Sequence, residues 1–133
     1  MRYFVVGPII RVDAAGDGHF GAPRGSRTHN GVDYCCTPGG FVHSPVDGTV
    51  TKLGYCYTDD PYWRYVEVTD DSGLRHRLFY TLPLVLNDEL VTAGQIIGEA
   101  QDVSQRYPGQ GMKPHVHYEI MDASGSYINP ETV

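Results

Sequence analysis

Residues 65–80 read YVEVTDDSGLRHRLFY and carry the clearest fold signal in the chain. Apolar and polar residues alternate over residues 65–69, which is the period of a β-strand with one buried and one solvated face. Residues 70–73 form a turn sequence that ends in glycine, and residues 74–80 begin a second strand-like run. The stretch therefore predicts an antiparallel β-hairpin.

Short runs rich in Val, Ile, Tyr and Thr continue on both sides of this hairpin, punctuated by 16 glycines and 9 prolines. No long stretch keeps a helical period, so the sequence predicts an all-β fold with at most one short helix, at residues 101–107. Strands are predicted at residues 3–6, 31–34, 48–53, 65–69, 74–82, 95–99 and 115–121. We expect residues 1–133 to form a single domain, because no linker or repeat interrupts them.

Composition narrows the class of protein. With 41% apolar and 20% charged residues, the chain has no apolar run approaching the roughly 20 residues of a membrane span. A net charge of −6 argues against a nucleic-acid partner. The odd set Cys35, Cys36 and Cys56 predicts free thiols. The first residues, MRYFVVGPIIRV, resemble a strand rather than a signal peptide, so we expect cytoplasmic synthesis.

Two histidine motifs carry the chemistry. His115 and His117 lie two apart in PHVHYEI, so a strand places both imidazoles on one face. The segment THNGVD offers His29 and Asp33, with Gly31 between them to allow a bend. Together the motifs supply two imidazoles and a carboxylate, a set suited to catalytic zinc, which leaves a fourth position for water. Either motif alone is equally typical of an exposed polar surface.

The joint pattern of His29-x-x-x-Asp33 and, some 80 residues later, His115-x-His117 resembles the lysostaphin/LytM zinc metallopeptidases. The resemblance covers roughly residues 18–131 and includes four further segments: FGAPR at 20–24, VHSPVDGTV at 42–50, VTAGQIIG at 91–98 and INPE at 128–131. It implies an antiparallel sheet that forms a groove and one zinc ion held by His29, Asp33 and His117.

The resemblance also implies roles for nearby residues. His115 would be catalytic, because in this family the first histidine of the pair assists the attacking water or stabilises the tetrahedral intermediate. Asn30 and Arg24 are placed at the groove by their position next to the motif. Glu119 shares a strand face with both histidines and is a candidate to orient an imidazole, or a solvated strand residue. The implied substrate is a peptide of bacterial peptidoglycan.

One position departs from the family pattern. Members commonly carry a further histidine in a Tyr-x-His-Leu strand, and the matching stretch here has Thr81 in its place. His76 lies on the opposite face of a regular strand, so only a bulge would let it substitute. The Tyr80 phenol could donate a hydrogen bond to an oxyanion. On a regular strand, however, its side chain points to the face opposite to that of residue 81, so this role also needs a bulge or a change of register. Losing one such group typically slows a reaction by a factor of about 10² to 10⁴.

Two functions follow from these residues. The first is a zinc-dependent endopeptidase acting on peptidoglycan stem or cross-bridge peptides, in a phage lysin or in a virion-associated component with other virion proteins as partners. The second is a catalytically weakened or inactive structural module that binds zinc or peptidoglycan, in which Thr81 marks the loss of catalysis. No membrane partner is expected, and an origin in a phage or in a bacterium stays open.

Overall fold

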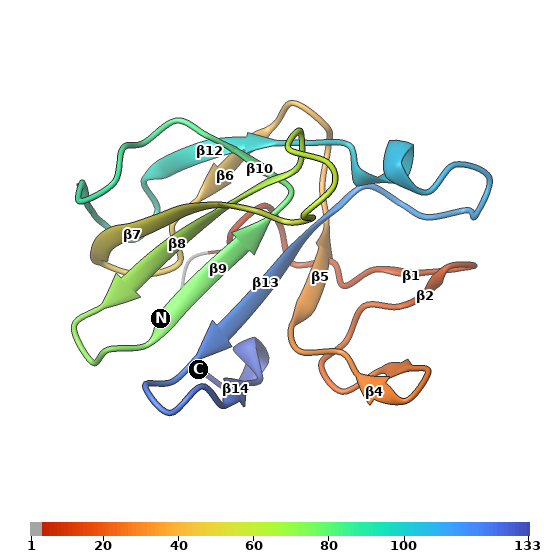
Figure 1. The fold of residues 1–133 in the computed structure, drawn as a ribbon, viewed down its shortest axis with the longest axis horizontal. Coiled ribbons are helices and arrows are strands. Elements are labelled where there is room, and N and C mark those ends of the chain that lie inside the picture. The colour runs from red at the N-terminus through yellow and green to blue at the C-terminus, as the bar shows by residue number, and fades with distance from the viewer. Residues whose placement is uncertain (1–3) are drawn as a thin grey trace.

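A large antiparallel sheet, built around the predicted hairpin, carries the histidine motifs. The computed structural model describes residues 4–133. The strands of this sheet are β5 (Val32–Cys35), β7 (Gly48–Tyr55), β8 (Arg64–Asp70), β9 (Arg75–Phe79), β11 (Leu90–Val91), β13 (His115–Met121) and β14 (Tyr127–Ile128). They follow the order β11-β7-β8-β9-β13-β14, and β5 also pairs with β13. Figure 1 shows β7, β8, β9 and β13 side by side.

The remaining elements are smaller. A second sheet has the order β10-β12-β6, formed by β6 (Phe41–His43), β10 (Thr81–Pro83) and β12 (Ile96–Ala100). Two ribbons pair β1 (Val12–Asp13) with β2 (Gly16–Asp17), and β3 (Pro23–Arg24) with β4 (Arg27–Thr28). In Figure 1 β1, β2 and β4 lie on the side of β5 that faces away from β9. Two 3-10 helices, η1 (Val103–Arg106) and η2 (Pro130–Thr132), complete residues 4–133, and neither they nor any other described helix is long and apolar enough to span a membrane.

Both sheets contribute side chains to one apolar core. Its fully buried members include Val66 and Val68 from β8, Leu78 from β9, Val116, Tyr118 and Ile120 from β13, Val42 from β6 and Ile97 from β12. Because side chains alternate along a strand, the other residues of β13 project from the opposite face, among them His115, His117 and Glu119. The strand that fills the core therefore also presents the histidine pair.

The structure confirms the all-β class and the hairpin. β8 and β9 pair with Thr69 opposite Arg75, and the Asp70 carboxylate accepts backbone N–H bonds from Ser72 and Leu74 within the turn. His76 is fully buried on the core face, between the Tyr118 hydroxyl at 2.7 Å and the Asp70 carboxylate at 2.8 Å. Its imidazole is therefore held away from the other histidines.

Three predicted elements differ from the structure, two of them outside the hairpin. Of the strand predicted at residues 3–6, residue 3 lies outside the described residues and residues 4–6 form no strand, because Val5 contributes a single carbonyl bond to the His43 amide rather than a ladder. The helix predicted at residues 101–107 is the four-residue 3-10 helix η1, and η2 was not predicted. The buried side chain of Val103 and the bonded side chain of Asp102 fix the short turn locally.

The strand predicted over residues 74–82 is broken at Tyr80, whose backbone φ is +65°. This left-handed conformation is uncommon for a residue with a side chain and interrupts the alternation of faces. The chain leaves the large sheet after Phe79 and enters the smaller one at Thr81. Thr81 is fully buried, and its methyl group lies 2.4 Å from where a Cβ on Gly98 would be, so its side chain points into the packed interior.

The three cysteines are free thiols, each half-buried. Cys36 packs against the core, and the Cys56 thiol donates to the carbonyl of Arg64 at 3.2 Å. Burial raises the pKa of Cys36 and of Cys56 to about 12, which keeps both thiols protonated at neutral pH.

Candidate metal centre

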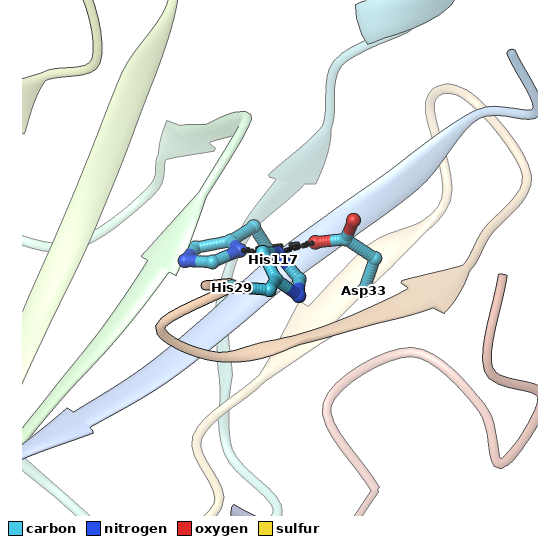
Figure 2. Close-up of side chains that lie close together, drawn as sticks. All are labelled: His29, Asp33 and His117. Carbon is cyan, nitrogen blue, oxygen red and sulfur yellow. Dashed lines mark hydrogen bonds and ion pairs between the residues drawn. The ribbon is translucent and has the colours of Figure 1, made fainter. Parts of the chain in front are cut away.

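Three side chains from distant parts of the sequence converge on one point. His29 Nε2 lies 3.2 Å from Asp33 Oδ1, His117 Nδ1 lies 2.9 Å from the same oxygen, and the two nitrogens are 3.1 Å apart. Figure 2 shows the two imidazoles and the carboxylate pointing toward one another. His29 and Asp33 are buried and His117 is nearly so. This trio is the group of candidate metal ligands found among residues 4–133.

Strand register brings the trio together. His117 on β13 stands directly opposite Asp33 on β5, so their side chains share a face. His29 precedes β5 and reaches the same point because the backbone turns at Asn30 and Gly31. A Cβ at Gly31 would lie 2.3 Å from the Tyr118 carbonyl oxygen, so only glycine permits this close approach to β13.

The second nitrogen of each imidazole has a fixed partner. His29 Nδ1 lies 3.1 Å from the His19 carbonyl oxygen, which can only accept, so that nitrogen carries the proton. His117 Nε2 lies 2.8 Å from Glu119 Oε1 and donates to it in the same way. A cation at the shared point would meet lone pairs on His29 Nε2 and His117 Nδ1, because the other nitrogen of each ring keeps its proton. Without a cation there, both atoms face the Asp33 carboxylate within hydrogen-bond distance.

Arg11 holds the other side of the Asp33 carboxylate. Its Nη2 and Nε donate to Asp33 Oδ2 at 3.1 and 3.3 Å, which leaves Oδ1 for the shared point. Burial alone would raise the pKa of Asp33, but hydrogen bonds from His117 and His29 hold it well below its usual range. The carboxylate is therefore ionised at neutral pH.

The site attracts positive charge. Although burial opposes it, hydrogen bonding to Asp33 and Glu119 raises the pKa of His117 to about 9, so a proton occupies this place in the absence of another cation. The three donor atoms are 2.9 to 3.2 Å apart. Ligands of a tetrahedral zinc ion with bonds of about 2.1 Å lie about 3.4 Å apart, so a small outward shift accommodates the ion. Donor chemistry, tautomers and spacing all fit a metal cation.

His115 lies beside the trio without joining it. Its Nδ1 donates to the Lys113 carbonyl at 2.9 Å, so Nε2 carries a lone pair, 3.6 Å from Asp33 Oδ2. Burial lowers the pKa of His115, against the attraction of Asp33, which favours the neutral imidazole. The residue has the geometry of a proton acceptor next to the metal centre.

Tyr80 reaches the site because of its left-handed backbone. Its ring meets that of His115 edge to face, with centroids 5.5 Å apart. Its hydroxyl lies 3.2 Å from the Tyr57 hydroxyl, which lies 2.6 Å from that of Tyr107. Burial raises the pKa of Tyr80 well above its usual value, so the phenol keeps its proton. The irregularity on which the sequence-based hypothesis depended is therefore present.

A cavity of about 520 Å³ surrounds these groups. Asn30, Tyr80 and Glu119 line it together with His29, Asp33, His115 and His117. Thr81, a candidate groove residue because it takes the place of the family's further histidine, does not line the cavity. The turn at Tyr80 directs its side chain into the interior. The groove also contains residues that the sequence analysis missed, notably Arg11, Arg27 and Arg77.

A row of charges on the sheet supports His117. Arg77 Nε donates to Glu67 Oε2 at 2.7 Å, and Arg77 Nη1 lies 3.7 Å from Glu119 Oε2. These residues are cross-strand neighbours on β8, β9 and β13, which explains their contact. Arg77 thus helps to hold the Glu119 carboxylate in place, and Glu119 accepts the hydrogen bond from His117 Nε2.

A candidate metal centre of this composition on an antiparallel sheet groove defines the class of the fold: it is that of the LytM/lysostaphin-type peptidase domains. The catalytic domain of the antimicrobial peptidase lysostaphin from Staphylococcus simulans superposes with a TM-score of 0.66 at 22% identity, covering 88% of each chain. A mutant catalytic domain of the prophage-encoded M23 protein EnpA from Enterococcus faecalis gives 0.66 at 22% identity, covering 96% of this chain and 95% of that one.

The chain belongs to peptidase family M23, whose family model matches residues 27–130. It is 36% identical over 109 residues to an uncharacterized metalloprotease of Haemophilus influenzae, covering 80% of this chain but only 21% of that protein. It is also 29% identical over 121 residues to leukocyte cell-derived chemotaxin-2 of Mus musculus, covering 87% of this chain and 75% of that protein.

Proposed function

We propose that this chain is a zinc-dependent endopeptidase that hydrolyses peptide bonds in the stem or cross-bridge peptides of bacterial peptidoglycan. The observation that carries the proposal is the convergence of His29 Nε2, Asp33 Oδ1 and His117 Nδ1 in a cavity that also holds His115. Membership of family M23 and the fold shared with the antimicrobial peptidase lysostaphin support the reaction and the substrate class.

His29, Asp33 and His117 would hold the zinc ion. When bound, it would polarise the reacting carbonyl and lower the pKa of a water ligand. His115 Nε2, kept unprotonated by the bond of Nδ1 to Lys113, takes the proton of the attacking water and passes it to the leaving amine. Arg11 and Glu119 keep Asp33 and His117 in their ligating orientations.

Tyr80 supplies the donor that Thr81 does not. The hydroxyls of Tyr80, Tyr57 and Tyr107 carry one proton each and make two O···O contacts with one another. Two of the three protons serve these contacts, so one O–H is free to donate to another group. Either oxygen of each contact can be the donor, and a series that runs from Tyr107 through Tyr57 to Tyr80 leaves the free O–H on Tyr80. There it would stabilise the oxyanion of the tetrahedral intermediate.

The first test removes the proton acceptor. His115→Ala is expected to lower the rate of peptidoglycan solubilisation by a factor of about 10² to 10⁴ while one zinc remains bound. Wild type, the variant and a His19→Ala control, whose exposed side chain does not line the cavity, are incubated with peptidoglycans of several cross-link types, with and without chelator. Mass spectrometry of soluble fragments measures the cleavage. Background release by zinc-loaded wild type on every substrate would overturn the proposal.

The second test addresses the oxyanion donor. Tyr80→Phe removes only the hydroxyl, so we expect kcat to fall by a factor of about 10² to 10³ with zinc content unchanged. Tyr62→Phe is the matched control, because that ring is exposed and lies outside the cavity. Equal kcat for wild type and Tyr80→Phe on a peptide that wild type cleaves would remove Tyr80 from the mechanism.

A second candidate is a zinc- or peptidoglycan-binding module with weak or no catalysis. Two observations favour it: the buried position of Thr81, with no further histidine in the cavity, and the likeness to a relative named as a chemotaxin. Zinc and peptidoglycan binding with no fragment release would support this candidate. The biological setting that we propose is a phage lysin or virion-associated component, made in the cytoplasm and released by lysis or carried in the virion, in keeping with the prophage-encoded EnpA.

A further inference from the structure

The cavity is rich in positive charge although the chain is acidic. Arg11, Arg24, Arg27 and Arg77 line it, against the carboxylates of Asp33 and Glu119. The chain as a whole carries a net charge of −6. A bound metal ion would make the cavity more positive still. This contrast points to an anionic partner for the cavity rather than to general solubility.

Two of the four arginines are already neutralised. Arg11 pairs with Asp13 at 2.7 Å and with Asp33 at 3.1 Å. Arg77 pairs with Glu67 at 2.7 Å and lies 3.7 Å from Glu119. Both guanidinium groups serve the protein's own carboxylates, so neither explains the excess charge.

The other two arginines retain binding capacity. Arg24 donates to the carbonyls of Asp17 at 2.7 Å and Pro23 at 3.0 Å, and its carboxylate contact, with the Arg11-bound oxygen of Asp33, is a long 3.9 Å. Arg27 is exposed and forms no ion pair with any residue from 4 to 133. Each guanidinium still has donors for a ligand.

The two side chains are held on the same face of one short ribbon. Arg24 stands directly opposite Arg27 in the β3–β4 pair. Like charges in this arrangement repel and destabilise the ribbon, and a bound anion would relieve the repulsion. The ladder continues to the metal centre, because the His29 amide donates to the Ala22 carbonyl at 2.9 Å and the Gly21 amide to the His29 carbonyl at 2.9 Å.

The β3–β4 ribbon also sets the distance between the two arginines and the peptide bond that would be cleaved at the metal centre. Arg27 lies two residues before His29, and two residues of extended chain span about 7 Å. A peptide lying extended across the cavity has the same spacing, so the pair would meet a group within about two residues of the bond at the metal. Planar guanidinium groups match carboxylates, to which they make paired hydrogen bonds.

We infer that Arg24 and Arg27 form a carboxylate-binding subsite that selects peptides with a free carboxylate, on a side chain or at the C-terminus, within about two residues of the cleaved bond. The inference rests on the proposed peptidase function for its substrate, but binding tests it without cleavage. It predicts that amidation of that carboxylate weakens recognition, and that added salt weakens it too.

The experiment compares three synthetic stem-type peptides that carry a fluorophore. One has a glutamate side-chain carboxylate, the second has the corresponding amide, and the third has the carboxylate but an amidated C-terminus. Fluorescence anisotropy gives Kd for zinc-loaded wild type, Arg24→Gln, Arg27→Gln, the double variant and Lys52→Gln. The control removes one exposed positive charge on β7, outside the cavity. The second and third peptides separate the two carboxylate sources.

Wild type is expected to bind a carboxylate peptide about 10- to 100-fold more tightly than its amide, and the double variant to bind both equally. Lys52→Gln should keep the wild-type preference, and circular dichroism checks that each variant folds. Equal binding of acid and amide by wild type, no binding of any peptide, or equal losses in Lys52→Gln would overturn the subsite. If the protein cleaves peptidoglycan but binds acid and amide equally, the peptidase function stands and the subsite is rejected. If it prefers the acid but cleaves no substrate, the subsite stands and the peptidase function is rejected.

Discussion

Asp33→Asn is expected to abolish zinc retention and to reduce peptidoglycan cleavage to background. Arg11 donates two hydrogen bonds to Asp33 Oδ2, so the amide oxygen of an asparagine will stay with Arg11. The amide nitrogen then replaces Oδ1 and directs N–H donors at the point where His29 and His117 present lone pairs. The change removes the ligand's charge and its lone pair together, and we expect zinc affinity to fall by more than about 100-fold.

Elemental analysis after dialysis against a weak chelator measures the effect. Wild type should retain about one zinc per chain, and Asp33→Asn almost none. Asp13→Asn is the matched control, because it removes the other carboxylate that pairs with Arg11 but lies outside the ligand trio. His29→Gln provides a second ligand variant if Asp33→Asn folds poorly. Full zinc retention by both folded ligand variants would refute the assignment of the metal centre.

Gly31→Ala is expected to destabilise the protein by about 3 kcal/mol and to weaken zinc binding at the same time. The added Cβ would lie 2.3 Å from the Tyr118 carbonyl oxygen and 3.0 Å from Cε1 of the His117 ring. The first neighbour is backbone in the centre of β13 and cannot move without disturbing its pairing with β5. The second is a candidate ligand, so the same methyl group acts on stability and on the site.

Chemical denaturation measures the free energy of unfolding, and a competition assay measures zinc affinity. Gly7→Ala is the control, because a Cβ there meets no atom within 4 Å and should change stability by less than about 0.5 kcal/mol. If Gly31→Ala unfolded with the wild-type free energy, the close approach of residue 31 to β13 would be wrong.

The candidate ligands were accessible from the sequence because strand periodicity determines faces. The two-residue spacing of His115 and His117 places both on one side of β13, and the alternation in residues 65–80 sets the faces of β8 and β9. Nothing in the sequence gives the register that stands His117 opposite Asp33. The order of the motifs indicated the site by resemblance, and the pairing of β5 with β13 explains it physically.

Other features depend on tertiary contacts that local patterns do not encode. The left-handed Tyr80 reads as one more residue of a strand, since the chain break there arises from the transfer between two sheets. Arg11 follows an apolar run in the sequence, and nothing local shows that its side chain is buried. Its burial is explained only by the ion pair with Asp33, which is 22 residues away in the chain. The strand predicted at residues 3–6 is wrong over residues 4–6 for the same reason, because Val5 is buried there without a ladder while Phe4 is exposed.

The break at Tyr80 acts as a phase shift in the strand. Before it, Phe79 faces the cavity and Leu78 the core; after it, Tyr80 faces the cavity as well and Thr81 the core. One backbone torsion angle thus moves the position that serves the site by one residue along the chain. Aligned letter by letter, the further histidine of the family's Tyr-x-His-Leu strand falls on Thr81, whereas in space the side chain that occupies the groove is its neighbour, Tyr80. A motif comparison that includes this chain therefore has to follow strand phase as well as residue identity.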